Sequence, residues 1–349
     1  MTTIYPFPPQ LNHNPYLDDL YGELAHTFTV DRRSPRRSLL ALIVGRGPRI
    51  LHLHFFDAII QRHNKVATWM RSITWIALLM FLRWRGVTIV WTVHNALPHE
   101  CPHPAIATRT VAHVLAQCHA VSVHHHATRT LLMEQYAPRV PIHVIPHGHN
   151  VQPFGAMPSR TDARYQLGLP ADKPVLLYMG MIRRYKGLET LIEAMALLPH
   201  MHLIIAGFAA DTDYLSEIHR HTARRINVTI RPRFLPDHEA AVYLAACDML
   251  ILPYRAITTS GMLVNAQAAG IICVVPNLPP LLEQVRDAVS GFVYPAENSG
   301  ALAQTIERAM HHPERASIAA HAQRQLAGHT WPQVAQLFTT MFHSVCPPS

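Results

Sequence analysis

Short apolar runs of strand length recur along the whole chain, and stretches of helical spacing separate them. Four runs lie in the first half, at 49–54 (RILHLH), 88–93 (TIVWTV), 120–123 (AVSV) and 142–145 (IHVI). Six more follow in the second half, at 175–179, 202–206, 228–231, 249–252, 272–275 and 291–294. Strands that alternate with helices are typical of a parallel sheet covered by helices. The sequence therefore predicts the α/β class, with one such domain in each half.

Breakers of regular structure concentrate between the two halves. Residues 146–158 contain proline, glycine and polar side chains, and a short helix is predicted directly after them, at 160–167. A length of 349 residues also suits two domains better than one. We therefore place an N-terminal domain at 1–150 and a C-terminal domain at 151–325.

The charge balance favours anionic partners. Thirty Lys and Arg against 22 Asp and Glu give a formal charge of +8, which suits nucleotides or lipid phosphates. We expect no nucleic acid partner, because the arginines at 224–225 and 231–233 lack an aromatic stacking pattern. The N-terminus has no signal-peptide pattern and the five cysteines form no CxxC pair, so we expect a cytoplasmic protein.

Histidine is abundant, but its spacing does not indicate a metal site. The chain has 26 histidines, including the triplet His124-His125-His126. It has no HExxH motif and no paired Cys/His spacing of the structural zinc type. We therefore expect no metal and no other cofactor, and attribute the histidines to composition.

One predicted helix, at 66–84, is unusually apolar. Its uninterrupted apolar stretch, 75–82, is much shorter than the roughly 20 residues that span a bilayer, so we expect that this helix does not cross a membrane. Two interpretations stay open for this helix. It is buried between the sheet and neighbouring helices, or it lies in a membrane interface with its tryptophans and arginines at the headgroups.

A basic loop follows the strand at 175–179, in the segment YMGMIRRYKGLETL (178–191). Gly180 ends the strand, Arg183 and Lys186 supply cations, and a helix begins near Gly187. Backbone N–H groups of a helix N-terminus beside two cations suit a diphosphate. The alternative is an ordinary basic turn on the surface.

A second loop, 253–270 (PYRAITTSGMLVNAQAAG), follows the strand at 249–252. Four of its residues stand where a helix should start and offer hydroxyl and backbone N–H groups: Thr258, Thr259, Ser260 and Gly261. Both loops follow carboxyl ends of strands, where open α/β sheets bind ligands. Together they predict a phosphate site, although a plain helix cap also explains the Thr/Ser cluster.

Three ordered motifs resemble a known family. GxIRRYKG, PYRxxxTSGxLxxAxAxG and PxLPxLxExVxxxxxGFVY are similar to the donor domain of GT-B glycosyltransferases of the family 4 type, including bacterial exopolysaccharide sugar transferases. The similarity covers most of 170–310, and the segments 49–57 and 89–100 are looser matches. The resemblance implies two Rossmann-like domains that face a central cleft. It also implies a C-terminal helix, 326–349, that packs back on the N-terminal domain.

The resemblance assigns roles to individual residues. It implies that Arg183 and Lys186 neutralise the leaving nucleoside diphosphate, and that the turn at 258–261 binds this diphosphate or the sugar. Phe234 and Leu235 would border the base. His94 matches the family's cleft histidine near the transferred sugar, with a structural histidine at a strand end as the alternative.

Two departures from the family pattern concern the site. Many members carry two glutamates around the second loop, and this chain has Ile257 and Asn265 there; Asn265 could still bind a ribose hydroxyl. The family's glycine-rich loop after the first strand is replaced by 8–20. Three residues of this segment are expected to line the acceptor side: His13, Asn14 and Tyr16.

We therefore expect a hexosyltransferase that takes a nucleotide-diphosphate sugar as donor. The expected acceptor is a saccharide, glycan or polyprenyl-diphosphate-linked saccharide in bacterial glycan biosynthesis, at the inner face of the plasma membrane. Retention and inversion both stay open, and inversion requires a base, for which Asp57, His94 and Glu100 are candidates. The alternatives are a silent nucleotide- or membrane-binding partner of a transferase, and a sugar-nucleotide epimerase.

Overall fold

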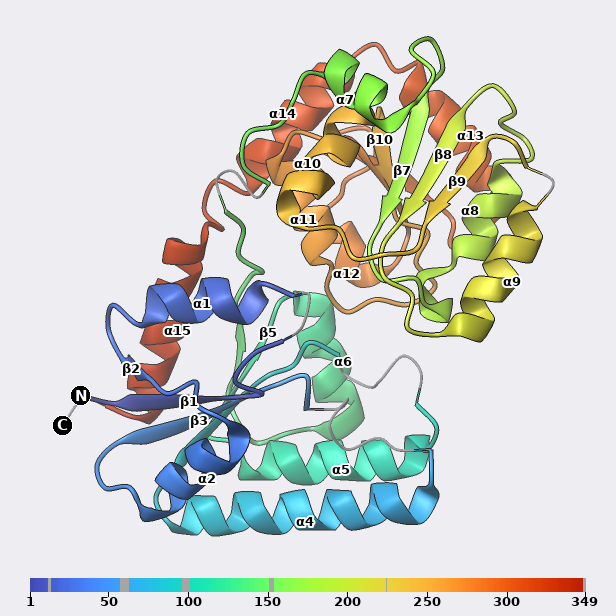
Figure 1. The fold of residues 1–349 in the computed structure, drawn as a ribbon. Coiled ribbons are helices and arrows are strands. Elements are labelled where there is room, and N and C mark those ends of the chain that lie inside the picture. The colour runs from blue at the N-terminus through green and yellow to red at the C-terminus, as the bar shows by residue number, and fades with distance from the viewer. Residues whose placement is uncertain (12–13, 57–62, 96–100, 151–153, 224, 348–349) are drawn as a thin grey trace. The chain divides into compact units, whose positions relative to one another are not determined.

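The computed structural model describes residues 1–11, 14–56, 63–95, 101–150, 154–223 and 225–347. The chain forms two compact units, unit 1 (1–148 with 331–349) and unit 2 (149–330) (Figure 1). Each unit contains a six-stranded sheet in which all strand pairs are parallel. The α/β class predicted from the sequence is confirmed.

The sheet of unit 1 has the strand order β2-β1-β3-β4-β5-β6. Its strands are β1 (Thr3–Phe7), β2 (Thr29–Val30), β3 (Arg49–His54), β4 (Thr88–Thr92), β5 (Ala120–Val123) and β6 (Ile142–Val144). Its helices are α1 (Tyr16–Leu24), α2 (Pro35–Val44), α4 (Lys65–Trp84), α5 (Pro104–Gln117), α6 (His126–Tyr136) and α15 (Trp331–Val345). The strand β1 was not among the predicted strands, because Pro6 interrupts its apolar run.

Alternating side chains of unit 1 face two different helix layers. Ile50 packs in a core cluster with residues of α1 and α15, whereas its neighbour Leu51 packs with residues of α4 and α5. Successive side chains of a strand point to opposite faces of a sheet, so both faces of this sheet are buried. The helix α15 brings Trp331, Phe338 and other apolar side chains from the end of the chain into the first of these layers.

The sheet of unit 2 has the strand order β12-β11-β10-β7-β8-β9. Its strands are β7 (Val175–Met179), β8 (His202–Ala206), β9 (Val228–Arg231), β10 (Met249–Ile251), β11 (Cys273–Pro276) and β12 (Phe292–Tyr294). Its helices are α7 (Arg160–Leu167), α8 (Leu188–Ala194), α9 (Thr212–Thr222), α10 (Asp237–Ala246), α11 (Gly261–Ala268), α12 (Pro279–Leu282), α13 (Ser299–Met310) and α14 (Arg315–Gln325), with a 3-10 turn, η1 (Arg184–Lys186).

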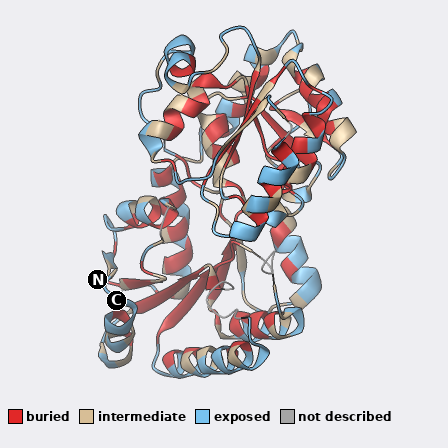
Figure 2. Cartoon of the chain, turned by 45° about the vertical axis from the view of Figure 1, so that its right-hand side comes forward, coloured by how far each residue is buried: buried red, intermediate tan, exposed pale blue. Residues whose placement is uncertain are grey.

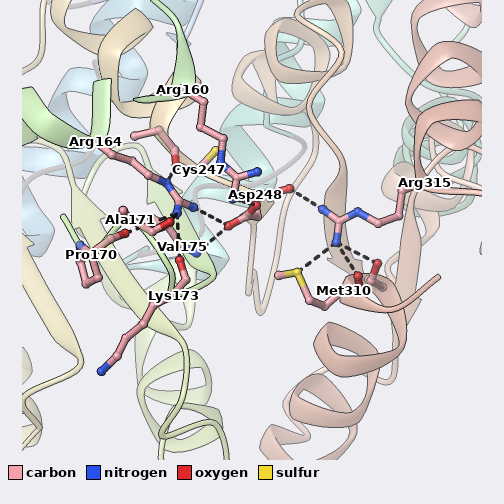
Figure 3. A network of polar contacts seen from close by, with 12 residues as sticks. Arg160, Arg164, Pro170, Ala171, Lys173, Val175, Cys247, Asp248, Met310 and Arg315 are labelled. Carbon is pink, nitrogen blue, oxygen red and sulfur yellow. Dashed lines mark hydrogen bonds and ion pairs between the residues drawn. The ribbon is translucent and has the colours of Figure 1, made fainter. Parts of the chain in front are cut away.

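A buried ion-pair network ties the helices of unit 2 to the amino ends of its central strands (Figure 3). Asp248, just before β10, pairs with Arg160 and Arg164 of α7 and accepts a hydrogen bond from the backbone N–H of Val175 at 2.7 Å. Arg315 of α14 donates to the backbone carbonyl of Asp248 at 3.0 Å. Arg164 is buried and also donates to four backbone carbonyls. The network therefore lies at the amino ends of the strands, and the loops that follow the carboxyl ends lie at the opposite end of the sheet.

The apolar helix α4 corrects one expectation from the sequence. It is a continuous helix of 20 residues, and by length and composition it could cross a membrane. The prediction that length excludes spanning is therefore wrong, since arginines interrupt the apolar sequence without interrupting the helix. One face of α4 packs in unit 1, through Leu79 and Leu82, while most of the helix surface is exposed (Figure 2).

Candidate functional site

The basic loop of unit 2 forms a tight turn between β7 and α8. Gly180 has φ 148° and Gly187 has φ 65°, both in the range that favours glycine. A Cβ atom on Gly187 would lie 2.2 Å from the backbone oxygen of Pro253 in the loop after β10. The basic loop and the loop after β10 therefore lie directly against each other, as their positions after adjacent strands predict.

Lys186 lies between aromatic rings of these two loops. Its Nζ atom is 4.0 Å from the ring centroid of Tyr254 and 4.9 Å from that of Tyr185. The backbone N–H of Arg255 donates to the carbonyl of Tyr185 at 3.0 Å, which fixes the contact between the loops. Such cation–π contacts hold an ammonium group in place while leaving it able to bind an anion.

Burial changes the protonation of Lys186. Burial, the larger cause, and the cationic Arg183 together lower the pKa of the Lys186 ammonium from 10.5 to about 7. A bound diphosphate would oppose both effects, because it supplies the negative charge that the two cations lack. The phosphate site predicted for this loop is compatible with these electrostatics and stays a prediction.

Arg184, the other cation of the loop, serves a structural contact. It pairs with Glu217 of α9 at 2.8 Å, and its guanidinium lies 4.8 Å from the ring centroid of Tyr214. These contacts hold the side chain of Arg184 against α9.

The hydroxyl-rich turn caps helix α11. Ser260 accepts a hydrogen bond from the backbone N–H of Leu263 at 3.2 Å, and its Oγ lies 3.1 Å from the hydroxyl of Tyr254. Thr258 is buried, and the Oγ1 atom of Thr259 is buried with no hydrogen-bond partner among the described residues. The helix-cap interpretation thus holds for Ser260, while Thr259 retains a hydroxyl for a ligand.

The remaining predicted donor-side residues differ in exposure. Asn265 is half-buried on α11, one turn beyond Ser260. Phe234 is 39% exposed, whereas Leu235 is 8% exposed and packs in the core of unit 2. The side chain of Phe234 can therefore still make the predicted contact with a base. Leu235 could make this contact only through its main chain.

In unit 1, four adjacent parallel strands are each followed or ended by a histidine. They are His54 on β3, His94 after β4, His124 after β5 and His147 after β6. Tyr16, the first residue of α1, lies among them, with ring centroids 4.8 to 5.8 Å from those of the four histidines. We call these five residues the histidine cluster.

His94 is buried and neutral within this cluster. Its ring stacks on Phe55 at 3.8 Å between centroids, and its Nε2 lies 3.1 Å from Nδ1 of His54. Burial lowers the pKa of His94 well below its usual range, and neighbouring histidines add to the effect. Burial likewise lowers the pKa of His124 to about 3. The cluster therefore offers uncharged hydrogen-bonding groups at neutral pH.

Two buried polar atoms of the cluster have no hydrogen-bond partner among the described residues. They are the hydroxyl of Tyr16 and Nε2 of His124. Because Nδ1 of His124 donates to the carbonyl of Ile145 at 2.9 Å, Nε2 of this neutral ring is an acceptor. Buried polar groups are normally satisfied, so these atoms are candidates for contacts with a polar ligand.

The predicted acceptor-side residues lie partly in this cluster. Tyr16 is one of its members, and Asn14 accepts a hydrogen bond from the backbone N–H of Tyr16 at 3.0 Å, which positions the start of α1. His13 and the base candidates Asp57 and Glu100 lie outside the described residues. The roles of all these residues stay predictions.

Sequence reasoning missed His54, His124 and His147 as a group. The available signal was that each predicted strand from β3 to β6 has a histidine at its carboxyl end, which we had attributed to composition. Among the described residues no group of three His, Cys, Asp or Glu is placed to hold a metal ion. The absence of a cofactor stays a prediction.

Comparisons with known proteins bear on the fold and on the class of enzyme. Residues 159–325 match the family of glycosyl transferases group 1. The GDP-mannose:glycolipid 4-beta-D-mannosyltransferase of Xanthomonas campestris pv. campestris is 27% identical over 94% of this chain and 88% of its own length. Sucrose-phosphate synthase of Thermosynechococcus elongatus has a similar structure, with a TM-score of 0.77, 17% identity, and coverage of 99% of this chain and 98% of that one.

A third comparison concerns a protein solved with a ligand. The Anabaena protein HepE, in complex with UDP-glucose, matches with a TM-score of 0.76 and 18% identity, over 99% of this chain and 100% of that one. The two parallel sheets together with these similarities define the GT-B fold. The chain is a nucleotide-sugar-dependent glycosyltransferase, and its residues 159–325 are similar to the group 1 family.

Proposed function

We propose that this enzyme transfers a mannosyl residue from GDP-mannose to a lipid-linked saccharide at a membrane surface. The cation pair of the basic loop in unit 2 is the observation that carries the donor part. The choice of GDP-mannose, and of a lipid-linked acceptor, rests on the Xanthomonas mannosyltransferase, whose similarity extends over nearly the whole chain.

Charge development explains why the basic loop would matter for catalysis. Glycosyl transfer leaves negative charge on the departing nucleoside diphosphate as the sugar–oxygen bond breaks. Arg183 can bind phosphate oxygens in a bidentate manner, and Lys186 supplies a point charge already fixed between two rings. Fixed cations at this place stabilise the transition state more than the ground state.

The donor part is tested by nucleotide-dependent thermal stability. A ligand that binds only the native state raises the apparent melting temperature by mass action. We expect GDP to stabilise the wild type more than UDP, ADP or dTDP, and expect Lys186→Ala to lose this effect. Arg184→Ala is the matched control, because it removes a cation of the same loop that pairs with Glu217. Equal stabilisation of wild type and Lys186→Ala would contradict the assigned site.

The membrane part rests on an exposed apolar surface of unit 1. We define the α4 surface as the exposed apolar side chains of α4: Val66, Trp69, Met70, Ile73, Met80, Phe81 and Trp84. Exposed Leu40 and Val44 of α2 extend it, since Arg85 after α4 donates to the carbonyl of Ile43 at 3.0 Å. Arginines 36, 37, 71 and 83 are also exposed on these helices. An apolar surface with tryptophans and arginines suits the interface of an anionic bilayer.

This arrangement supports a peripheral enzyme at the inner, cytoplasmic face of the plasma membrane. We expect wild-type protein to sediment with vesicles that contain anionic lipid, and expect a Trp69→Ser/Trp84→Ser variant to stay in solution. Tyr165→Ser is the control, because Tyr165 is an aromatic residue of unit 2 that is 90% exposed. Vesicle binding that both variants retain equally would remove the α4 surface from the proposal.

A further inference from the structure

A continuous series of hydrogen bonds runs through the buried interior of unit 1 and ends at His94. We call it the relay, and its members in order are Ser122, Thr92, His52, Tyr21, His54 and His94. The successive donor–acceptor distances are 2.7, 2.8, 2.7, 2.8 and 3.1 Å. Every member is at most 4% exposed. The relay lies on the sheet face that α1 and α15 cover, as contacts of His52 with Phe338 and Phe342 show.

The relay admits only two arrangements of its hydrogen atoms. Burial lowers the pKa of His52 to about 3 and that of His54 well below its usual range, so both rings are neutral. A neutral imidazole has one N–H donor and one acceptor nitrogen, and a tyrosine hydroxyl has one hydrogen to donate. When each hydroxyl donates its hydrogen along the relay, one link sets all the others, so the hydrogens point either toward His94 or toward Ser122.

The hydroxyl of Ser122 decides between the two arrangements. If the hydrogens point toward His94, Ser122 donates to Thr92 and every hydrogen of the relay before His94 has an acceptor, so only Nδ1–H of His94, at the end of the relay, is left for a ligand. If they point the other way, Thr92 donates to Ser122, whose own hydrogen then has no acceptor among the described residues. A buried donor without an acceptor costs about 1–3 kcal/mol. The first arrangement is therefore favoured.

We propose that Ser122, Thr92, His52, Tyr21 and His54 act as positioning residues that hold the proton of His94 on Nδ1. In this arrangement Nδ1–H of His54 donates to Nε2 of His94, so the remaining ring nitrogen of His94 is a hydrogen-bond donor. His94 then donates to an oxygen of the bound sugar or acceptor. This role in transfer rests on the proposed function, whereas the tautomer does not.

The same geometry argues against a proton-transfer role for His94. A base at this position would need its free nitrogen without a proton, which is the disfavoured arrangement. A proton passed inward would also have to leave at Ser122, which is fully buried. The relay thus orients His94 and provides no path for a proton out of unit 1.

The tautomer is measured directly by ring nitrogen shifts in protein labelled with 15N-histidine, without any substrate. We expect His52, His54 and His94 of the wild type each to carry the proton on Nδ1, with His94 assigned from the loss of its signals in His94→Asn. A proton on Nε2 of His94, or a charged His94 ring at neutral pH, would overturn the proposal.

Variants of Thr92 distinguish an effect of the relay on the His94 tautomer from a general effect on folding. Thr92→Val removes the hydroxyl that donates to His52, so we expect His94 to show a mixture of both tautomers. Thr92→Ser keeps the hydroxyl and should restore the wild-type signals. Thr88→Val is the matched control, because Thr88 lies on the same strand and outside the relay. Wild-type shifts of His94 in Thr92→Val would show that the relay does not set the tautomer.

Kinetics then test the role in transfer. We expect Thr92→Val to lower kcat about 3- to 10-fold with little change in the KM for the donor, since it disturbs orientation and not binding. Thr92→Ser and Thr88→Val should retain wild-type turnover. A changed tautomer with unchanged kcat would overturn the role in transfer. If the wild type turns over no sugar nucleotide at all, the proposed function fails, while the shifts still decide the orientation of the relay.

Discussion

The two units place different chemistry at the carboxyl ends of their parallel strands. In unit 1 these ends carry the histidine cluster, in which burial lowers the pKa of His54, His94 and His124 and keeps these three rings neutral. In unit 2 they carry a loop with Arg183 and Lys186. The same backbone architecture thus supplies uncharged hydrogen-bonding groups in one unit and cations in the other. The first set suits the hydroxyl groups of a saccharide, and the second suits a diphosphate.

Unit 2 also shows that its cations are not all equivalent. The buried Arg164 is matched by Asp248 and several carbonyls at the amino ends of the strands, and so is a structural cation (Figure 3). Lys186 lies at the carboxyl ends against aromatic rings, with a pKa lowered to about 7. The two cations thus differ in their partners as well as in their place: Arg164 has a carboxylate and carbonyls, whereas Lys186 lies against aromatic rings.

The largest effect is expected from a variant that removes the partner of the structural cation Arg164. Asp248→Ala leaves the buried guanidinium of Arg164 without its carboxylate, which should destabilise the protein by about 3–5 kcal/mol. Urea unfolding measures this change. Glu239→Ala, which removes an exposed ion pair with Arg233, is the control and should leave the stability almost unchanged. Equal effects of the two variants would refute the structural assignment.

The next largest effect is expected from a variant that removes Lys186. Lys186→Ala should lower kcat about 10²- to 10³-fold, because it removes one preorganised charge from the leaving diphosphate. Steady-state kinetics with saturating donor measure it, and a native melting temperature shows that folding is intact. Arg184→Ala should retain kcat within a few-fold. A change in KM alone would place Lys186 in ground-state binding and not in catalysis.

The pH dependence of nucleotide binding sharpens the role of Lys186. In the free protein its pKa is lowered to about 7, so the charged form is lost as pH rises through 7, whereas a bound diphosphate favours it. Affinity for GDP should therefore be greatest below pH 7 and fall by up to about tenfold per pH unit above it. Calorimetry between pH 6 and 9 measures this. In Lys186→Ala only the titration of the nucleotide itself remains, so this variant is the control. If the affinity of the wild type and that of Lys186→Ala fell equally with pH, the result would contradict the account.

A smaller effect tests the histidine cluster. The side-chain amide of Asn can place an N–H near the position of Nδ1 of His94, whereas that of Gln reaches the position of Nε2. If His94 donates through Nδ1, His94→Asn should retain roughly tenfold more kcat than His94→Gln, the order of one hydrogen bond to a neutral group. Initial rates of both variants give the ratio. A ratio below one would indicate that Nε2 is the functional nitrogen.

The two loops proposed to bind the donor could be located in the sequence because their signals are local. Strand, glycine, cations and helix start follow each other within the 14 residues 178–191, and in the loop after β10 the hydroxyl residues and Gly261 stand at the start of the next helix. The contact of Gly187 with Pro253, and the position of Lys186 between two rings, depend on how strands β7 and β10 pair. No local pattern contains that information.

The histidine cluster could not be predicted in the same way. Its members come from four strands and α1, and only the strand order of the sheet brings them together. His52 and His54 alternate with apolar residues in RILHLH, a pattern in which polar side chains usually face solvent. Here α1 and α15 cover that face, and α15 comes from the far end of the chain. Likewise, the sequence did not show that the side chain of Leu235 enters the core.

The release of GDP from GDP-mannose in the presence of a lipid-linked saccharide tests the central claim most directly. The account predicts release that requires the acceptor, exceeds that of UDP from UDP-glucose, and is lost in Lys186→Ala but not in Arg184→Ala. Release that is equal in wild type and Lys186→Ala, or no turnover of any sugar nucleotide by the wild type, would contradict it.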